Sequence, residues 1–127
     1  MPLYNDLIGR PFKDGGRGPE YDCWGLVREV YLRNGVVLPD FAHSALDIIS
    51  VGAEIEKQRH MPRWESILAP AKLCIVLIRF NSPITNHCGV YLGKDKFIHA
   101  REKVGVNIDR TTAPSWAHRI EGFYVPA

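Results

Sequence analysis

The chain has 127 residues, of which 46% are hydrophobic and 24% are charged. These are ordinary globular values, so we expect a single domain over residues 1–127 and exclude a disordered or coiled-coil protein. The net charge of +2 is not gathered into a Lys/Arg stripe, which argues against a nucleic-acid partner. No segment approaches the roughly 20 apolar residues of a membrane span, so we expect none.

The first residues and the cysteines indicate the cellular compartment in which the protein is made. Residues 1–6 contain neither a basic n-region nor an apolar h-region, so we expect no secretory signal and synthesis in the cytoplasm. Three cysteines, Cys23, Cys74 and Cys88, are poor material for a disulfide framework. We therefore expect free thiols.

The N-terminal segment combines a short apolar stretch with a loop. Apolar side chains in residues 4–8 favour a short helix. Residues 9–19 contain four glycines and two prolines, which is typical of a shaped loop. We expect the short helix to pack beneath this loop.

The next segment predicts a helix that begins at a cysteine. Apolar residues from Leu26 to Tyr31 recur at helical spacing, and Asn34-Gly35 is a left-handed stop signal, so the helix is expected from Asp22 or Cys23 to Asn34. Asp22 fits as its N-cap.

Cys23 therefore falls in the first turn of the predicted helix. Unpaired N–H groups and the positive end of the helix dipole favour an anion there, and a nearby histidine lowers a cysteine pKa further. This is where a nucleophilic thiol would be placed. The alternative is that Cys23 is a small buried hydrophobic residue.

The middle of the chain predicts a second helix. Residues 36–41 form a brief extended piece, and Ser44 is then expected to cap a half-buried helix within residues 45–61, or two short helices broken at Gly52. Pro62 closes this segment.

From Lys72 onward the sequence predicts strands. The continuous apolar run 73–78 is expected to be a buried central strand, which would make Cys74 structural and inert. Further strands are predicted at 86–93, 96–100, 104–108 and 119–125, the first two joined as a hairpin through Lys94-Asp95. Helices followed by strands indicate an α+β domain with N-terminal helices packed on an antiparallel sheet of four to six strands.

Two of the five histidines fall in this predicted hairpin. His87 and His99 lie six residues on either side of Gly93, so we expect them directly opposite each other on one face, where one imidazole can hold the tautomer of the other. The alternative is two satisfied core histidines. The other three are interpreted as surface or packing residues: His43, His60 and His118.

A metal site is the other structural option for these side chains. Cys23, His87, Cys88 and His99 could supply four ligands, but adjacent residues of a strand point to opposite faces and the chain has no CxxC or HxxxH spacing. We therefore expect no metal.

Three motifs in this order carry a family resemblance. Residues 21–27 after the Gly15-Gly16 loop, residues 87–93 and residues 97–100 look like NlpC-type peptidoglycan peptidases, which are small papain-like cysteine hydrolases. The resemblance spans residues 9–125. It implies a papain-like α+β fold, no cofactor, Cys23 as nucleophile, His87 as general base and acid, and His99 as the orienting third member.

The resemblance also implies a substrate. It is a peptidoglycan stem peptide, cut between γ-D-glutamate and a diamino acid such as diaminopimelate or lysine. Asp22 is then a candidate contact for a free substrate amine, with Tyr21 and Trp24 beside it. Two positions depart from the family: Phe12 stands where tyrosine is usual and Trp24 where many relatives carry serine, which affects specificity more than mechanism.

Other features resemble the branch found in phage and prophage tail proteins. These are Trp24, the Gly-Arg-Gly-Pro loop at 16–19 and the ending 122–126. They imply a virion tail location and other tail proteins as partners. A non-hydrolytic tail-tip or tail-assembly protein on the same scaffold, and a thiol acyltransferase or amidase, are the alternatives.

Overall fold

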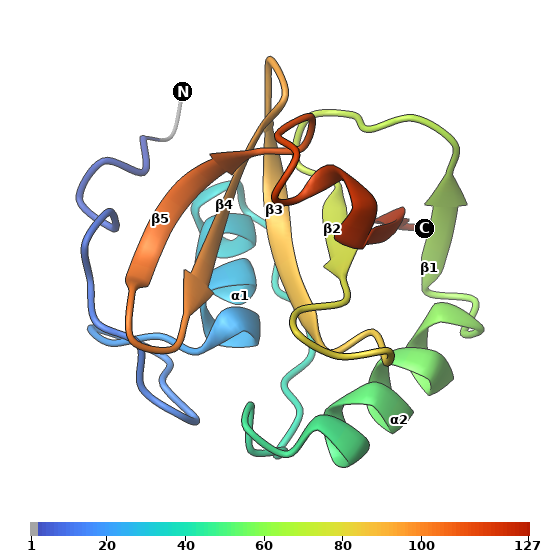
Figure 1. Cartoon of the computed structure of the whole chain (residues 1–127), viewed down its shortest axis with the longest axis horizontal. Helices are drawn as coiled ribbons and strands as arrows, with labels where there is room; N and C mark the ends of the chain where they lie inside the picture. The colour runs from blue at the N-terminus through green and yellow to red at the C-terminus, as the bar shows by residue number, and fades with distance from the viewer. Residues whose placement is uncertain (1–2) are drawn as a thin grey trace.

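The computed structural model describes residues 3–127 as two helices on a six-stranded sheet (Figure 1). The helices are α1 (Cys23–Arg33) and α2 (Ile48–Arg59). The strands are β1 (Trp64–Ile67), β2 (Ile75–Ile78), β3 (His87–Gly93), β4 (Lys96–Arg101), β5 (Gly105–Arg110) and β6 (Ile120–Pro126), with a 3-10 turn, η1 (Ala117–Arg119), before β6. The sheet order is β1-β6-β2-β3-β4-β5, and every neighbouring pair is antiparallel.

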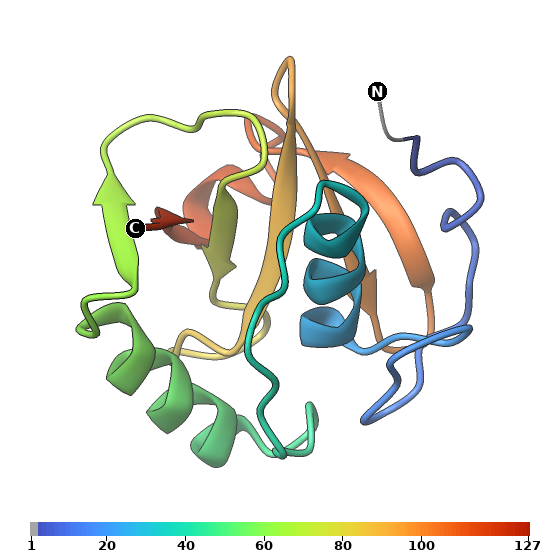
Figure 2. The same cartoon turned by 180° about the vertical axis from the view of Figure 1, so that it is seen from behind.

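Helix α1 forms where the sequence predicts it. The Asp22 carboxylate accepts from the N–H of Gly25, and the chain leaves the helix at Asn34 before Gly35 with a φ of 78°. Leu26, Val27 and Val30 are buried against the sheet, and burial of each such side chain stabilises the fold by roughly 1.5–3 kcal/mol. Figure 2 shows α1 lying across β3 and β4.

The sheet separates two apolar clusters. One lies under α1 and contains Cys23, Cys88, Val90 and Ile98. The other covers the opposite face. Its members come from β2 and the residue before it, from β3 and β4, and from the segment before η1: Cys74, Val76, Ile78, Tyr91, Phe97 and Trp116. Cys74 lies directly before β2, whose predicted span of 73–78 is shorter in the structure, and it is fully buried, as the sequence predicts for a structural residue.

Two local predictions are wrong. Residues 5–9 form turns instead of a helix, because Leu7 and Ile8 bond back only three residues and the Gly9 N–H pairs with Val106. The predicted Ser44 cap is also wrong, because helix α2 begins at Ile48 under an Asp47 cap and the Ser44 hydroxyl donates to Asp14. The helix continues through Gly52 unbroken, which is the single half-buried helix of the two predicted alternatives.

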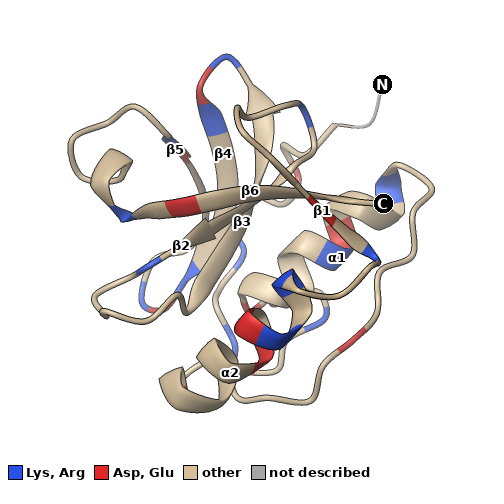
Figure 3. Cartoon of the chain, turned by 90° about the vertical axis from the view of Figure 1, so that its right-hand side faces the viewer, with Lys and Arg blue, Asp and Glu red and all other residues tan. Residues whose placement is uncertain are grey.

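Strand β1 was not predicted. It pairs with β6 at the edge of the sheet, and its two central residues are exposed. Among residues 3–127 there is no helix long and apolar enough to cross a membrane. In Figure 3 the basic residues are spread over helices, strands and loops.

Candidate active site

The candidate nucleophile lies at the start of α1. Cys23 is the first residue of the helix and is 8% exposed. The N–H groups of a first helical turn have no intrahelical acceptor, so this end of α1 favours negative charge on the sulfur. The N-terminus of α1, the start of β3 and the carboxyl end of β4 lie at the same end of the sheet (Figures 1 and 2).

Asp22 holds the loop that precedes the helix. Its carboxylate accepts from Gly25 N at 2.7 Å, Gly15 N at 3.1 Å and Arg17 Nη1 at 2.7 Å. Arg17 also bonds Asp40 at 2.9 Å, which ties the loop to the segment after α1. Burial raises the pKa of Asp22, opposed by the bonds from Gly25 and Arg17. The carboxylate is thus buried and has three donors within the protein, while its contact with substrate stays a prediction.

His87, His99 and Asp109 form a hydrogen-bonded chain from three adjacent strands. Nε2 of His87 lies 2.8 Å from Nδ1 of His99, and Nε2 of His99 lies 2.8 Å from Oδ2 of Asp109. Asn107 donates to the same Asp109 oxygen at 2.8 Å. His87 and His99 are both buried.

The prediction that the two histidines stand directly opposite each other is wrong. Val90 pairs with Ile98 and Tyr91 with Phe97, so the residue opposite His99 is Gly89, and His87 is its diagonal neighbour on the same face. The register differs because the hairpin turn is irregular between Tyr91 and Gly93. Imidazole rings are long enough to bridge the diagonal.

The chain of bonds fixes the tautomers. A carboxylate only accepts, so Nε2 of His99 carries the proton and Nδ1 of His99 is the acceptor. His87 then donates from Nε2, and its Nδ1 is left as the basic nitrogen. Burial lowers the pKa of His99 to about 4, so this ring is neutral at neutral pH. The bond from His99 lowers the pKa of Asp109, which keeps the carboxylate ionised.

The Cys23 thiol has two hydrogen-bonding neighbours. A bond from Cys88 and a bond from His87 lower the pKa of Cys23 well below its ordinary value, and the charge on His87 adds to this. The same contact with Cys23 raises the pKa of Cys88. Cys88 therefore stays protonated and Cys23 becomes the thiolate, which is the nucleophilic form.

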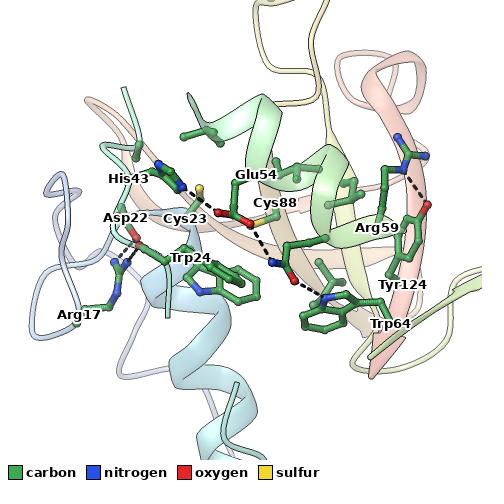
Figure 4. Close-up of a pocket in the computed structure, with 17 residues that line it drawn as sticks. Arg17, Asp22, Cys23, Trp24, His43, Glu54, Arg59, Trp64, Cys88 and Tyr124 are labelled. Atoms are coloured by element: carbon green, nitrogen blue, oxygen red, sulfur yellow. Dashed lines mark hydrogen bonds and ion pairs between the residues drawn. The ribbon is translucent and has the colours of Figure 1, made fainter. Parts of the chain in front are cut away.

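A pocket extends from Cys23 between α1 and α2 (Figure 4). Cys23 and Cys88 lie on its α1 side, and Arg59, Trp64 and Tyr124 lie at its far end. On the α2 side His43 bonds Glu54 at 2.9 Å, and Gln58 bonds Glu54 at 2.8 Å and Trp64 at 3.1 Å. The remaining wall is mostly apolar, so the pocket combines apolar surface with a small number of polar and charged side chains.

The structure brings together most of the predicted site residues. Cys23, Asp22 and Trp24 line the pocket, and the Trp24 ring packs on Phe41 while its N–H donates to Pro39 O at 2.9 Å. Tyr21 is buried beside Gly18 in the preceding loop. His60 and His118 are exposed, as predicted for surface residues.

Two residues were missed. Asp109 lies one residue beyond the predicted strand 104–108, and continuing that alternation would have placed it on the face of Asn107 and His99. His43, interpreted as a surface or packing residue, lines the pocket. No sequence signal links His43 to Cys23, because their place in one pocket depends on how residues 34–47 return past α1.

Fold and site together define a small α+β protein of papain-like architecture with a cysteine at a helix start facing a histidine pair. The chain belongs to the NlpC/P60 family, whose model matches residues 9–125. The resemblance noted from the sequence motifs is confirmed at the level of this family.

Curated relatives agree with this assignment. The chain is 28% identical over 117 residues to a probable endopeptidase p60 of Listeria innocua, covering 91% of this chain and 22% of the relative. It is 29% identical over 119 residues to a probable endopeptidase NlpC homolog of Haemophilus influenzae, covering 91% of this chain and 55% of the relative. The chain thus spans about a fifth to about half of these relatives.

Solved structures share the fold. An NlpC/P60 family protein from Bacillus cereus superposes with a TM-score of 0.65 at 19% identity, over 96% of this chain and 39% of that one. The NlpC/p60 domain of the peptidoglycan hydrolase SagA gives a TM-score of 0.62 at 22% identity, over 95% of this chain and 90% of that one. The predicted α+β, papain-like architecture is confirmed.

Proposed function

We propose that this domain is a cysteine endopeptidase of peptidoglycan stem peptides that cuts the bond between γ-D-glutamate and a diamino acid. The observation that carries the proposal is the position of Cys23 at the start of α1, with its thiol pKa lowered by Cys88 and His87. The names of its relatives, probable endopeptidases and a peptidoglycan hydrolase, support the substrate class.

The reaction follows from the tautomers. The Cys23 thiolate attacks the γ-carbonyl carbon, and N–H groups at the start of α1, including that of Cys23, stabilise the oxyanion. Protonated His87 gives its Nδ1 proton to the leaving amine, which releases the diamino acid and leaves a thioester. His87 then takes a proton from water, and the hydroxide attacks the thioester to release the γ-carboxylate.

The test uses a γ-D-glutamyl-diaminopimelate stem peptide, with products followed by mass spectrometry. Wild-type protein is expected to cleave it and the Cys23→Ala variant is not. Failure of the wild type to cleave, while Cys23 still reacts rapidly with iodoacetamide near neutral pH, would mean that the site is reactive and the substrate is wrong.

Within this proposal the domain acts in a phage tail during penetration of the cell wall and is carried by the virion with other tail proteins. The support is the sequence likeness to the tail branch at Trp24, residues 16–19 and residues 122–126. Mass spectrometry of purified virions from a producing lysogen is expected to find the chain in tail fractions.

A non-hydrolytic tail protein is the second candidate. It is favoured by Phe12, which packs against the α1 cluster where the family usually has a tyrosine hydroxyl. Absence of cleavage together with slow alkylation of Cys23 would favour it.

A further inference from the structure

Two arginines share one aromatic stack on the far side of the histidine pair. The rings of Phe80 and Trp116 are stacked with centroids 5.7 Å apart. Cζ of Arg101 lies 5.8 Å from the Phe80 centroid and 5.3 Å from that of Trp116. Cζ of Arg119 lies 5.6 Å and 5.7 Å from the same two centroids. Two positive charges are therefore held beside one pair of rings.

Within the described part of the chain neither guanidinium is engaged in an ion pair, although the charge of Arg101 helps to lower the pKa of the nearby Asp109. Among residues 3–127, the side chains of Arg101 and Arg119 make no ion pair and donate no hydrogen bond, and Nε of Arg101 is buried without an acceptor. The neighbouring Arg79 differs, because its Nε lies 3.0 Å from Oε2 of Glu121. Guanidinium groups bring five donors each, and two like charges on one site repel, so this arrangement favours an anion.

This arginine pair adjoins the candidate active site. The Phe80 ring lies 5.7 Å from the His87 ring, and the Trp116 ring lies 4.8 Å from the His99 ring. Arg101 follows His99 by two residues on β4 and shares its face of the sheet. The charge of Arg101 also lowers the pKa of His99, after the larger effect of burial, which is consistent with a short separation.

We propose that Arg101 and Arg119 form a subsite that binds a carboxylate of the substrate. This inference rests on the proposed function, because a stem peptide carries carboxylates on both sides of the scissile bond. They are the α-carboxylate of γ-linked D-glutamate and the free carboxylate of diaminopimelate. Planar guanidinium forks match a carboxylate with paired hydrogen bonds.

The experiment uses three peptides: the γ-D-glutamyl-diaminopimelate substrate, its D-glutamate α-amide and its diaminopimelate amide. Binding is measured calorimetrically to the Cys23→Ala protein, and cleavage is measured with wild type. Amidation of the bound carboxylate is expected to weaken binding and raise KM by roughly 10- to 100-fold, the range of a charge-assisted hydrogen bond. The amide that shows the loss identifies which carboxylate is bound.

Variants connect the loss to the arginines. Arg101→Gln and Arg119→Gln, each made separately, are expected to weaken binding of the acid and to leave binding of the sensitive amide unchanged. Arg79→Gln, which removes an arginine already paired with Glu121, is the matched control and should bind all three peptides as before. Thermal unfolding of each variant monitors folding.

The outcomes separate the subsite from the activity. Equal binding of all three peptides, or absence of binding, overturns the subsite, as does an arginine variant that weakens acid and amide alike. Binding that depends on the carboxylate and on the arginines, without cleavage by wild type, would support the subsite and contradict the proposed peptidase.

Discussion

Oδ2 of Asp109 lies 2.8 Å from Nε2 of His99, and this contact determines which nitrogen of His87 is basic. The carboxylate requires a proton on Nε2 of His99, and His99 in turn requires a proton on Nε2 of His87. Nδ1 of His87 is then free to exchange a proton with Cys23. Asp109 is therefore a positioning residue that acts through two imidazole rings.

Replacement of Asp109 by Asn is expected to lower kcat by roughly tenfold to a hundredfold, at or below the low end of a general acid–base contribution, because Asp109 acts through two rings and not on the substrate. An amide can donate to His99 and favour the wrong tautomer. KM should change little, because Asp109 does not line the pocket. A kcat equal to that of wild type, with unchanged thermal unfolding, would contradict the role.

The buried His99 predicts a pH dependence of stability. Its pKa is about 4 in the folded protein and near 6.5 when unfolded, so below pH 6.5 the unfolded chain binds a proton that the folded protein does not. The free energy of unfolding should therefore fall as pH drops from 6.5 to 4, by about 3 kcal/mol from this residue. Asp109, whose pKa is lowered, contributes in a separate window below its ordinary value.

The measurement is urea unfolding at pH 7, 5.5 and 4 for wild type and for His99→Asn. The variant lacks the titrating ring, so its stability should change less over this range. If the free energy of unfolding changed with pH by the same amount in both proteins, His99 would not titrate as described. At neutral pH we also expect His99→Ala to lower turnover by a larger factor than its effect on folding stability explains.

Substitution of Cys88 is expected to change the reactivity of Cys23. Its thiol is the leading cause of the lowered Cys23 pKa, so Cys88→Val should raise that pKa, whereas Cys88→Ser keeps a donor and should change it less. The pKa of Cys23 in each variant is measured from the pH dependence of its alkylation by iodoacetamide, followed by mass spectrometry. Cys74, fully buried and with its pKa raised by burial, should remain unmodified and is an internal control.

The sequence predicted those parts of the fold that depend on local pattern. The Cys23 helix has a cap, an apolar face and a glycine stop, and β2 lies within the continuous apolar run 73–78, so neighbours in sequence determine both. The helix predicted near residues 5–9 is a turn in the structure. Local pattern could not show this, because the Gly9 N–H donates to the carbonyl of Val106, which is distant in sequence.

The candidate site was predictable where residue types are unusual for their surroundings. A cysteine at a helix start and two histidines in apolar strands stand out in a sequence. Asp109 and His43 do not, because acidic and polar residues are ordinary at strand ends and in loops. Their roles depend on strand register and on the path of a loop, which periodicity does not determine.

Gly25 provides a test of how the preceding loop is held over Cys23. A Cβ at this position would lie 2.0 Å from the backbone oxygen of Gly16, and backbone cannot move aside as a side chain can. Helix propensity alone would make Gly25→Ala stabilising by about 1 kcal/mol. The clash with Gly16 should outweigh this gain in helix propensity, so the free energy of unfolding should fall by roughly 1–3 kcal/mol.

Gly122→Ala is the matched control, since its Cβ would meet nothing closer than the Tyr124 ring at 3.4 Å. Urea unfolding should therefore separate the two variants by more than about 1 kcal/mol. Gly25→Ala should also slow alkylation of Cys23, because displacement of Gly16 disturbs the loop that Asp22 ties to the start of α1. A Gly25→Ala protein as stable as wild type would show that the loop can move away from the helix without cost.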